Sequence, residues 1–211
     1  MAVVLSSLDG AVRIAGALLA RPLRKQRTTW GATPAEVAAT YPGDELVPQP
    51  KWGYTHAVDV AAPPEQIWPW LVQLGQGRGG FYSYEGLENL VGCKIRNTTQ
   101  ILPEYGSLMV GDEVKLHAKA PGLRVAVAEP GKALALFGGT DQSPEKSLWA
   151  FHIADSGDGH SRLIERGRYA YGSKLGGRIS FGPTLLEPIS FVMSRKMLLT
   201  IADLAGGTRP A

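Results

Sequence analysis

The segment from Arg78 to Asn89 holds the densest set of side chains that could do chemistry. Arg78 stands between glycines and could clamp a carboxylate or a phosphate through its planar fork of donors. The glycines around it permit positive φ angles and a close approach of the backbone to a ligand. Their spacing matches neither a Walker loop nor a dinucleotide-binding fingerprint. The alternative is that this segment is only a tight connection between two helices.

Glu88 and Tyr82 are candidate catalytic residues. A carboxylic acid in an apolar cavity has a raised pKa, so Glu88 could act as a general acid or base near neutral pH. The Tyr82 hydroxyl could donate to the oxygen of an enolate or a carbonyl group. The alternative for Glu88 is a structural ion pair with Arg166 or Arg168.

Tyr84, Glu85 and Asn89 are candidate ligand-binding residues on the helix expected over Ser83–Val91. Glu85 and Asn89 are four residues apart and share one face of that helix. Tyr84 lies with Glu88 on an adjacent stripe. The pattern therefore predicts polar side chains of two kinds on neighbouring faces of one short helix.

Three arginines alternate along the last expected strand, at positions 162, 166 and 168, so they share one face of it. If that face lines a cavity, Arg166 and Arg168 form an anion-binding wall; if it faces outward, they belong to a solvated stripe. Ile164 lies on the same face as the arginines and Leu163 on the other. The pattern does not show whether the arginine face of this strand points into a cavity or outward.

The four histidines and the single cysteine predict neither a metal site nor a cofactor. No pair of histidines has metal-ligand spacing, and Cys93 alone cannot form a disulfide within the chain. His117 lies in an expected strand, where a hydrogen-bonded structural histidine is common. It could also be a general base, because an unperturbed imidazole titrates at about pH 6.5. A lone thiol fits a reducing compartment, so we expect a cytoplasmic protein.

Trp70 and Trp149 are the aromatic residues that we expect at a ligand. Most of the tryptophans and phenylalanines must simply fill the core, since each buries a large apolar area. A subset at a cavity wall would favour an aromatic or polycyclic ligand.

Helical signals occur at four places that could position these residues. Thr33 can cap a short helix that begins at Pro34, and Pro63-Pro64 opens a helix that ends before Gly75. The helix over Ser83–Val91 follows. Apolar residues then repeat at a spacing near 3.6 over Thr184–Ala205, which predicts a long C-terminal helix.

Strand signals fill most of the remaining chain. Alternating and β-branched residues separated by glycine-rich or proline-rich turns predict six strands. Strands joined by such short turns pair antiparallel, and helices must cover one face of the sheet. The sequence predicts an α+β fold with an antiparallel sheet. The strands are expected over Thr55–Val60, Ser107–His117, Leu123–Ala128, Ala133–Gly138, Ser147–Ala154 and Arg162–Tyr171.

The charge of the chain is concentrated in its first residues. The 211 residues carry 22 Lys and Arg against 19 Asp and Glu, a net charge of +3. Residues 1–29 hold five basic residues and one acidic residue, or +4, which leaves −1 for residues 30–211. A neutral body without a basic aromatic face argues against nucleic-acid binding.

We expect residues 1–29 to be a basic, apolar-rich N-terminal leader helix and residues 30–211 to be one domain, with an irregular arm over 30–54. The apolar run from Val3 to Leu19 is interrupted by Asp9 and Arg13 and is followed by basic residues, the reverse of a secretory signal. Two interpretations stay open. The leader is either an amphipathic helix docked on the body or an interfacial helix that contacts a membrane peripherally.

The run from Ala61 to Gly75, which reads AAPPEQIWPWLVQLG and follows a strand, resembles the opening of the START-like superfamily, also called SRPBCC. The similarity extends through GRGGFYSYEGLEN at 77–89 to the arginine-bearing strand near the C-terminus. It also reaches upstream to WGAT at 30–33 and PGD at 42–44. About residues 30–205 are covered, and the 77–89 run resembles a bacterial branch of the superfamily.

The resemblance implies a helix-grip fold, in which a curved antiparallel sheet wraps around a long C-terminal helix and encloses an internal cavity. The implied function is binding of a hydrophobic small molecule, such as a polyketide, an aromatic compound or a lipid, as a carrier or a sensor. The alternative is a cyclase-like or dehydratase-like enzyme that uses a cavity carboxylate or histidine as its general acid or base. The sequence leaves the oligomeric state open.

Overall fold

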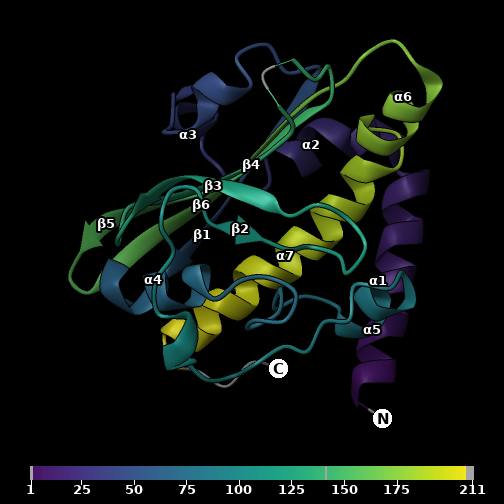
Figure 1. Ribbon diagram of the computed structural model, residues 1–211. Helices are drawn as coiled ribbons and strands as arrows, with labels where there is room; N and C mark the ends of the chain where they lie inside the picture. The colour runs from purple at the N-terminus through teal and green to yellow at the C-terminus, as the bar shows by residue number, and fades with distance from the viewer. Residues whose placement is uncertain (1, 141, 208–211) are drawn as a thin grey trace.

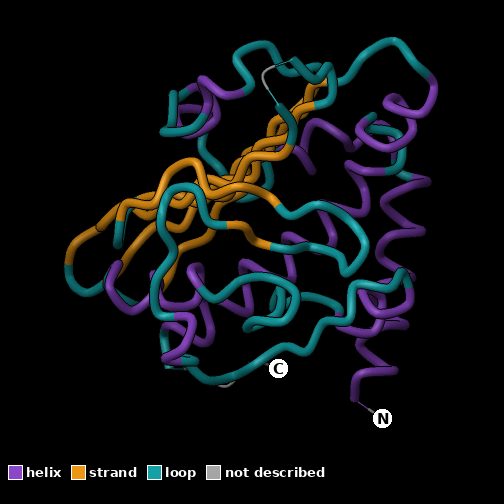
Figure 2. Tube along the Cα trace, in the orientation of Figure 1, coloured by secondary structure: helices purple, strands orange, loops and turns teal. Residues whose placement is uncertain are grey.

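The computed structural model describes residues 2–140 and 142–207, and it contains one six-stranded antiparallel sheet (Figures 1 and 2). The order across the sheet is β1-β6-β5-β4-β3-β2. The first strand therefore pairs with the last, with Ala57 opposite Ile164. The strands are β1 (Trp52–Val60), β2 (Glu113–Val114), β3 (Leu123–Glu129), β4 (Ala133–Gly138), β5 (Lys146–Gly157) and β6 (His160–Ala170).

The prediction of six antiparallel strands is confirmed, but the second strand is much shorter than expected. Pairing with β3 begins only at Glu113, because a turn occupies the first part of the expected segment 107–117. In that turn the Asp112 amide donates to the Met109 carbonyl, and Gly111 has a φ of +100°. An extended ladder cannot continue through a residue in this conformation.

Most of the helices lie on one face of the sheet and extend beyond it, whereas α3 (Pro34–Ala38) lies on the opposite face (Figure 1). The helices are α1 (Ala2–Leu19), α2 (Arg24–Thr28), α3 (Pro34–Ala38), α4 (Pro64–Val72), α5 (Glu85–Leu90), α6 (Leu175–Phe181) and α7 (Leu186–Ala205), with short 3-10 turns at Arg21–Leu23, Asp44–Leu46 and Pro103–Tyr105. The four helices predicted from capping residues and apolar spacing are present, and Thr33 closes the capping box of α3. The expected single leader helix over residues 1–29 is instead two helices, α1 and α2, separated by the 3-10 turn at Arg21–Leu23. The sequence did not predict α6.

The long helix α7 packs against β1 and α4, as Figure 1 shows. Fully buried apolar side chains fill the layer between this helix and the sheet, among them Leu136, Phe151, Leu198 and Ile201. An open antiparallel sheet with a long C-terminal helix is consistent with the helix-grip architecture. The internal cavity that the resemblance implies stays a prediction.

The opposite face of the sheet is covered by the arm that precedes β1. A second apolar cluster lies there, in which Val47 of the arm packs with Phe137, Leu148 and Ala150. Both faces of the central strands are therefore buried.

Helix α1 lies along α7 and also contacts α5 (Figure 1). Gly10 permits this close packing, since a Cβ atom there would lie 2.8 Å from the side chains of Tyr84 and Leu87. Of the described helices, none is both long enough and apolar enough to span a bilayer. The last four residues of the predicted domain, 208–211, lie outside the described part of the chain.

Candidate functional site

Arg78 lies in a closed loop and serves as a cap for α4. A bridge between Gly75 and Gly80 closes the loop. The Arg78 guanidinium donates to the Val72 carbonyl at 2.9 Å and lies over the Tyr105 ring, 4.4 Å from its centroid. Burial lowers the pKa of Arg78, and its Nε has no partner among the described residues. In the structure, this arginine supports the tight connection between helices that was the alternative to ligand binding.

Tyr82 is fixed in a strained backbone conformation inside the core. Its φ is +56°, and the Asn97 carboxamide oxygen accepts hydrogen bonds from the amides of Phe81 and Tyr82. Its hydroxyl accepts a 2.6 Å hydrogen bond from Gln73, and its ring meets Trp70 edge to face. Burial raises the pKa of Tyr82 well above its ordinary value. Tyr82 and Trp70, two predicted site residues, are thus in contact within the core.

Glu88 is a buried carboxyl group on α5 without a compensating charge. Burial, and then the nearby charge of Glu85, raise the pKa of Glu88 to about 7. Its Oε2 has no hydrogen-bond partner among the described residues. The alternative that Glu88 pairs with Arg166 or Arg168 is wrong, because both arginines bind Asp44.

The other predicted residues around α5 make structural contacts. Glu85 accepts a hydrogen bond from the Asn97 amide at 2.8 Å, and Asn89 closes the following loop through both of its hydrogen bonds to the Ile95 backbone. One nitrogen of His117 contacts the Val91 carbonyl at 3.1 Å, and the other accepts from the Lys119 amide. Both nitrogens of His117 are therefore occupied at the surface.

The arginine face of β6 is turned toward the arm and away from α7. Arg162 binds Glu36, and Arg166 donates to Asp44 at 2.8 Å. Arg168 donates to the carbonyls of Val47 and Pro48. The three side chains hold the arm against the sheet.

A buried carboxylate that the sequence analysis missed lies on the opposite face of β6. Glu165 is completely buried under α7. Its Oε1 accepts hydrogen bonds from Tyr54 at 3.0 Å, from Trp149 at 2.7 Å and from Ser194 at 2.8 Å. Because fixed donors occupy its acceptor positions, the Glu165 carboxylate is suited to holding the surrounding side chains in place. Strand alternation already placed residue 165 opposite the arginines, which was the available signal.

His56 connects Glu165 to the helices outside the sheet. Its Nδ1 lies 3.3 Å from Glu165 Oε2, and its Nε2 lies 2.9 Å from the carbonyl oxygen of Arg27. Arg27 in turn makes a buried, bidentate pair with Glu187 at 2.8 and 2.9 Å. This chain of contacts joins β6, β1, α2 and α7.

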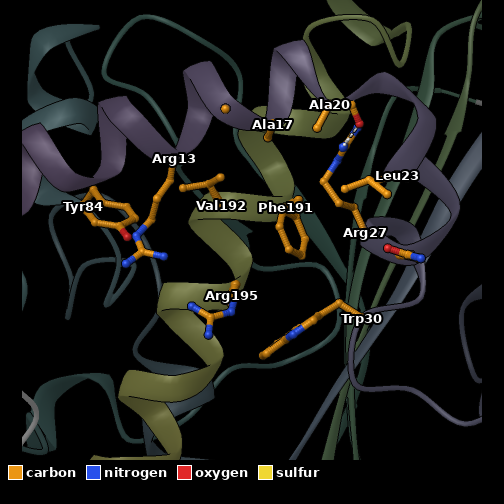
Figure 3. A pocket seen from close by; sticks show the side chains of 12 residues that line it. Arg13, Ala17, Ala20, Leu23, Arg27, Trp30, Tyr84, Phe191, Val192 and Arg195 are labelled. Carbon is orange, nitrogen blue, oxygen red and sulfur yellow. Dashed lines mark hydrogen bonds between the residues drawn. The ribbon is translucent and has the colours of Figure 1, made fainter.

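A cleft of about 410 Å³ lies between α1–α2 and α7, beside this chain of contacts. Figure 3 shows Arg13 and Tyr84 toward one end and Leu23, Arg27 and Trp30 toward the other. Trp30 and Phe191 both meet the His56 ring edge to face. The apolar wall of the cleft consists of Ala17, Ala20, Leu23, Trp30, Phe191 and Val192.

The cleft also holds cationic and phenolic groups. Arg195 lies over the Trp30 ring, 5.3 Å from its centroid, and forms no ion pair or hydrogen bond with the described residues. Arg13 pairs with Asp9 at 2.7 Å, and the Tyr84 hydroxyl donates to the same carboxylate. Burial, and then the bond to Asp9, raise the pKa of Tyr84. Among the predicted residues, Tyr84 is the one that lines the cleft.

A second hollow of about 700 Å³ lies at the other end of the fold, between α4 and the β3–β4 turn. It is lined by Trp68, Gly131 and Lys132, among others. Neither hollow lies between the sheet and the inner face of α7. Within the described residues, no group of three or more His, Cys, Asp or Glu side chains could hold a metal ion.

Comparison with known proteins finds no matching family model and no matching curated protein. Solved structures with a partial likeness include protein MLL2253 from Mesorhizobium loti, with 18% identity and a TM-score of 0.39 over 74% of this chain and 100% of that one. CalU16 from Micromonospora echinospora has 14% identity and a TM-score of 0.36 over 74% and 83%. DynU16, from the dynemicin biosynthetic locus, has 12% identity and 0.43 over 75% and 49%. The chain spans about half the length of DynU16.

Proposed function

We propose that the protein binds a hydrophobic small molecule, such as a polyketide, an aromatic compound or a lipid, as a carrier or a sensor. The binding site is the cleft between α1–α2 and α7. The observation that carries the proposal is an apolar cleft of about 410 Å³ whose wall includes Arg195, a cation that forms no ion pair with the described residues. This volume lies within the ~300–1,000 Å³ that small-molecule sites occupy.

The lining suits a ligand with an apolar body and an acidic or strongly polar group. Trp30 and Phe191 provide aromatic surface, and the small side chains of Ala17 and Ala20 leave room beside them. Arg195 offers donors that no described residue accepts, so an anionic group there would gain charge-assisted hydrogen bonds. The contact of Trp30 with His56, and of His56 with Glu165, holds one wall of the cleft rigid.

Gly16 provides a direct test, because it lines the cleft and a Cβ atom there would meet nothing within 4 Å. We expect Gly16→Phe to fill the cleft and to weaken binding of the fluorescent aromatic sulfonate ANS at least about tenfold. Ala15→Phe is the matched control, since Ala15 is exposed and does not line the cleft. Equal affinities of these two variants, or no binding by the wild-type protein, would refute the proposal.

The polar contact and the natural ligand need separate measurements. Arg195→Gln should weaken ANS binding while a neutral aromatic probe binds as before. Mass spectrometry of compounds released from the denatured protein, after gentle purification of the wild type and of Gly16→Phe, should find a compound in the wild type alone.

A cyclase-like or dehydratase-like enzyme is the second candidate function. The supporting observation is the Glu88 carboxyl group, whose pKa of about 7 suits a general acid or base. Glu88 does not line the cleft described above, so a substrate would have to reach Glu88 by a route other than this cleft. Glu88→Gln would abolish turnover of the retained compound without affecting its binding. Tyr82 and His117 remain candidates for the supporting donor and base in this mechanism.

A further inference from the structure

Helix α1 has two apolar faces, and only one of them is covered by the protein. The covered face contains Gly10 and Ile14 and packs on α5 and α7. The other face is exposed, with Val12 at 71% and Leu19 at 86% of full exposure. The exposed apolar row consists of Val4, Leu5, Leu8, Val12 and Leu19, and we call it the outer stripe of α1.

The outer stripe is continuous and carries no charge. At about 100° per residue, its five members fall within one arc of roughly 100°, and at about 1.5 Å per residue they extend over roughly 22 Å. The charged residues of the helix, Asp9 and Arg13, fall outside this arc. Arg13 faces the cleft, where its partner Asp9 also accepts from Tyr84. A single exposed apolar residue needs no explanation, but a row of this length does.

Exposed cations follow the outer stripe in the sequence, after the 3-10 turn at Arg21–Leu23. Arg24 and Lys25 are exposed on α2 and form no ion pair with a described residue, whereas Arg27 is occupied by Glu187. No acidic residue lies on the stripe to neutralise them. An apolar stripe next to unpaired cations is the pattern of a helix that lies in the plane of an anionic membrane surface.

We propose that the outer stripe of α1 docks the protein on an anionic lipid bilayer, with Arg24 and Lys25 among the headgroups. The helix does not satisfy the requirements for a membrane span, so it lies along the interface. A second copy of the chain would cover the same apolar row, but the stripe that it brought would supply no acidic residue to the two cations. The proposal does not depend on the cleft's having a ligand.

The orientation of α1 gives this docking a consequence for the cleft. The same helix presents Gly16, Ala17 and Ala20 to the cleft and the outer stripe to its surroundings. Docking through the stripe therefore places the cleft one helix diameter, roughly 10 Å, from the bilayer interface. A hydrophobic ligand could pass between the two over that distance.

Vesicle co-sedimentation of the full chain tests the proposal. We expect the wild type to bind vesicles of phosphatidylcholine and phosphatidylserine, and to bind pure phosphatidylcholine vesicles more weakly. Leu8→Gln/Val12→Gln should reduce binding at least about tenfold, since glutamine keeps the helix propensity while removing the apolar contact. Met109→Gln/Val110→Gln is the matched control, because it removes two equally exposed apolar side chains from a loop remote in sequence from α1. Far-UV circular dichroism checks that all variants keep their helix content.

Three results would overturn the proposal. One is the absence of wild-type binding to anionic vesicles. Another is an equal loss in the stripe variant and the Met109/Val110 control. The third is a wild-type dimer in analytical ultracentrifugation that Leu8→Gln/Val12→Gln dissociates, because the stripe would then be covered by a second copy. A loss of phosphatidylserine preference in Arg24→Gln/Lys25→Gln would support the role of the two cations.

Discussion

Replacing Glu88 by glutamine should stabilise the protein above neutral pH and leave its stability nearly unchanged in acid. The pKa of this buried carboxyl group rises from an ordinary value of 4.5 to about 7 on folding, first because burial disfavours the charge and then because Glu85 lies near. Between these two values the folded state binds more protons than the unfolded state. Stability contributed by the neutral carboxyl is therefore present below about pH 4.5 and lost as the pH rises through about 7.

The magnitude follows from the same pair of values. A difference of about 2.5 pH units corresponds to ~3 kcal/mol at 25 °C, which is the cost of ionising buried Glu88 at about pH 8. Glutamine has a similar shape and no charge, so Glu88→Gln avoids this cost. For a chain of this length, a gain of that size raises Tm by roughly 6–12 °C.

Urea unfolding at about pH 8 and about pH 4.5 provides the assay, with the free energy of unfolding compared between Glu88→Gln and the wild type. The titration of buried His152, whose pKa burial lowers to about 4, is common to both proteins and cancels in the difference. Glu104→Gln, at an exposed position, serves as the control and should change neither value. If Glu88→Gln is no more stable than the wild type at the higher pH, the carboxylate has a compensating partner and the reasoning is wrong.

Two further predictions concern the contacts that hold the N-terminal segments. Glu187→Gln leaves the buried Arg27 guanidinium without its carboxylate and should cost ~3–5 kcal/mol in urea unfolding; a cost below about 1 kcal/mol would show that the pair does not hold α2 on α7. Asp44→Asn removes the carboxylate shared by Arg166 and Arg168 and should speed limited proteolysis within residues 31–51 before the protein unfolds globally. Cleavage of this variant at the wild-type rate would contradict a role for Asp44 in holding the arm.

Local patterns were sufficient to predict most of the elements. The period of α7, the cap at Thr33 and the strand alternation each depend on residues close in sequence, and each matches the structure. The second strand was overpredicted because the turn at Gly111 is set by one backbone conformation. Residues 107–117 have the composition of a strand, and composition does not reveal such a turn.

The direction of the arginine face could not be predicted, because both faces of β6 are buried. An open sheet with one solvated face would show apolar residues on one side of the strand only. Here α7 covers one face and the arm covers the other, so Leu163 and Ile164 are both buried although they point in opposite directions. The arginines can lie on the covered arm side because each binds a carboxylate or carbonyl group there.

Glu165 was missed for a related reason. Its partners Tyr54, His56, Trp149 and Ser194 come from three other elements, β1, β5 and α7, which only the tertiary fold brings together. A lone acidic residue in an alternating strand predicts an exposed position unless such partners are known. The cleft was missed because it needs the leader segment and α7 at once, and these lie at opposite ends of the sequence.

The position of α1 determines which experiments can separate the two proposed roles of the N-terminal segment. Deleting residues 1–29 would remove the outer stripe, but it would also remove one wall of the cleft and the Arg27 partner of Glu187. Loss of vesicle binding and loss of ligand binding would then occur together whatever their causes. Substitutions on single faces avoid this, because Gly16 points into the cleft while Leu8 and Val12 point away from the protein. If Gly16→Phe loses only the ligand and Leu8→Gln/Val12→Gln loses only the membrane, one helix serves two independent surfaces; if either variant loses both, ligand and membrane binding are coupled through α1.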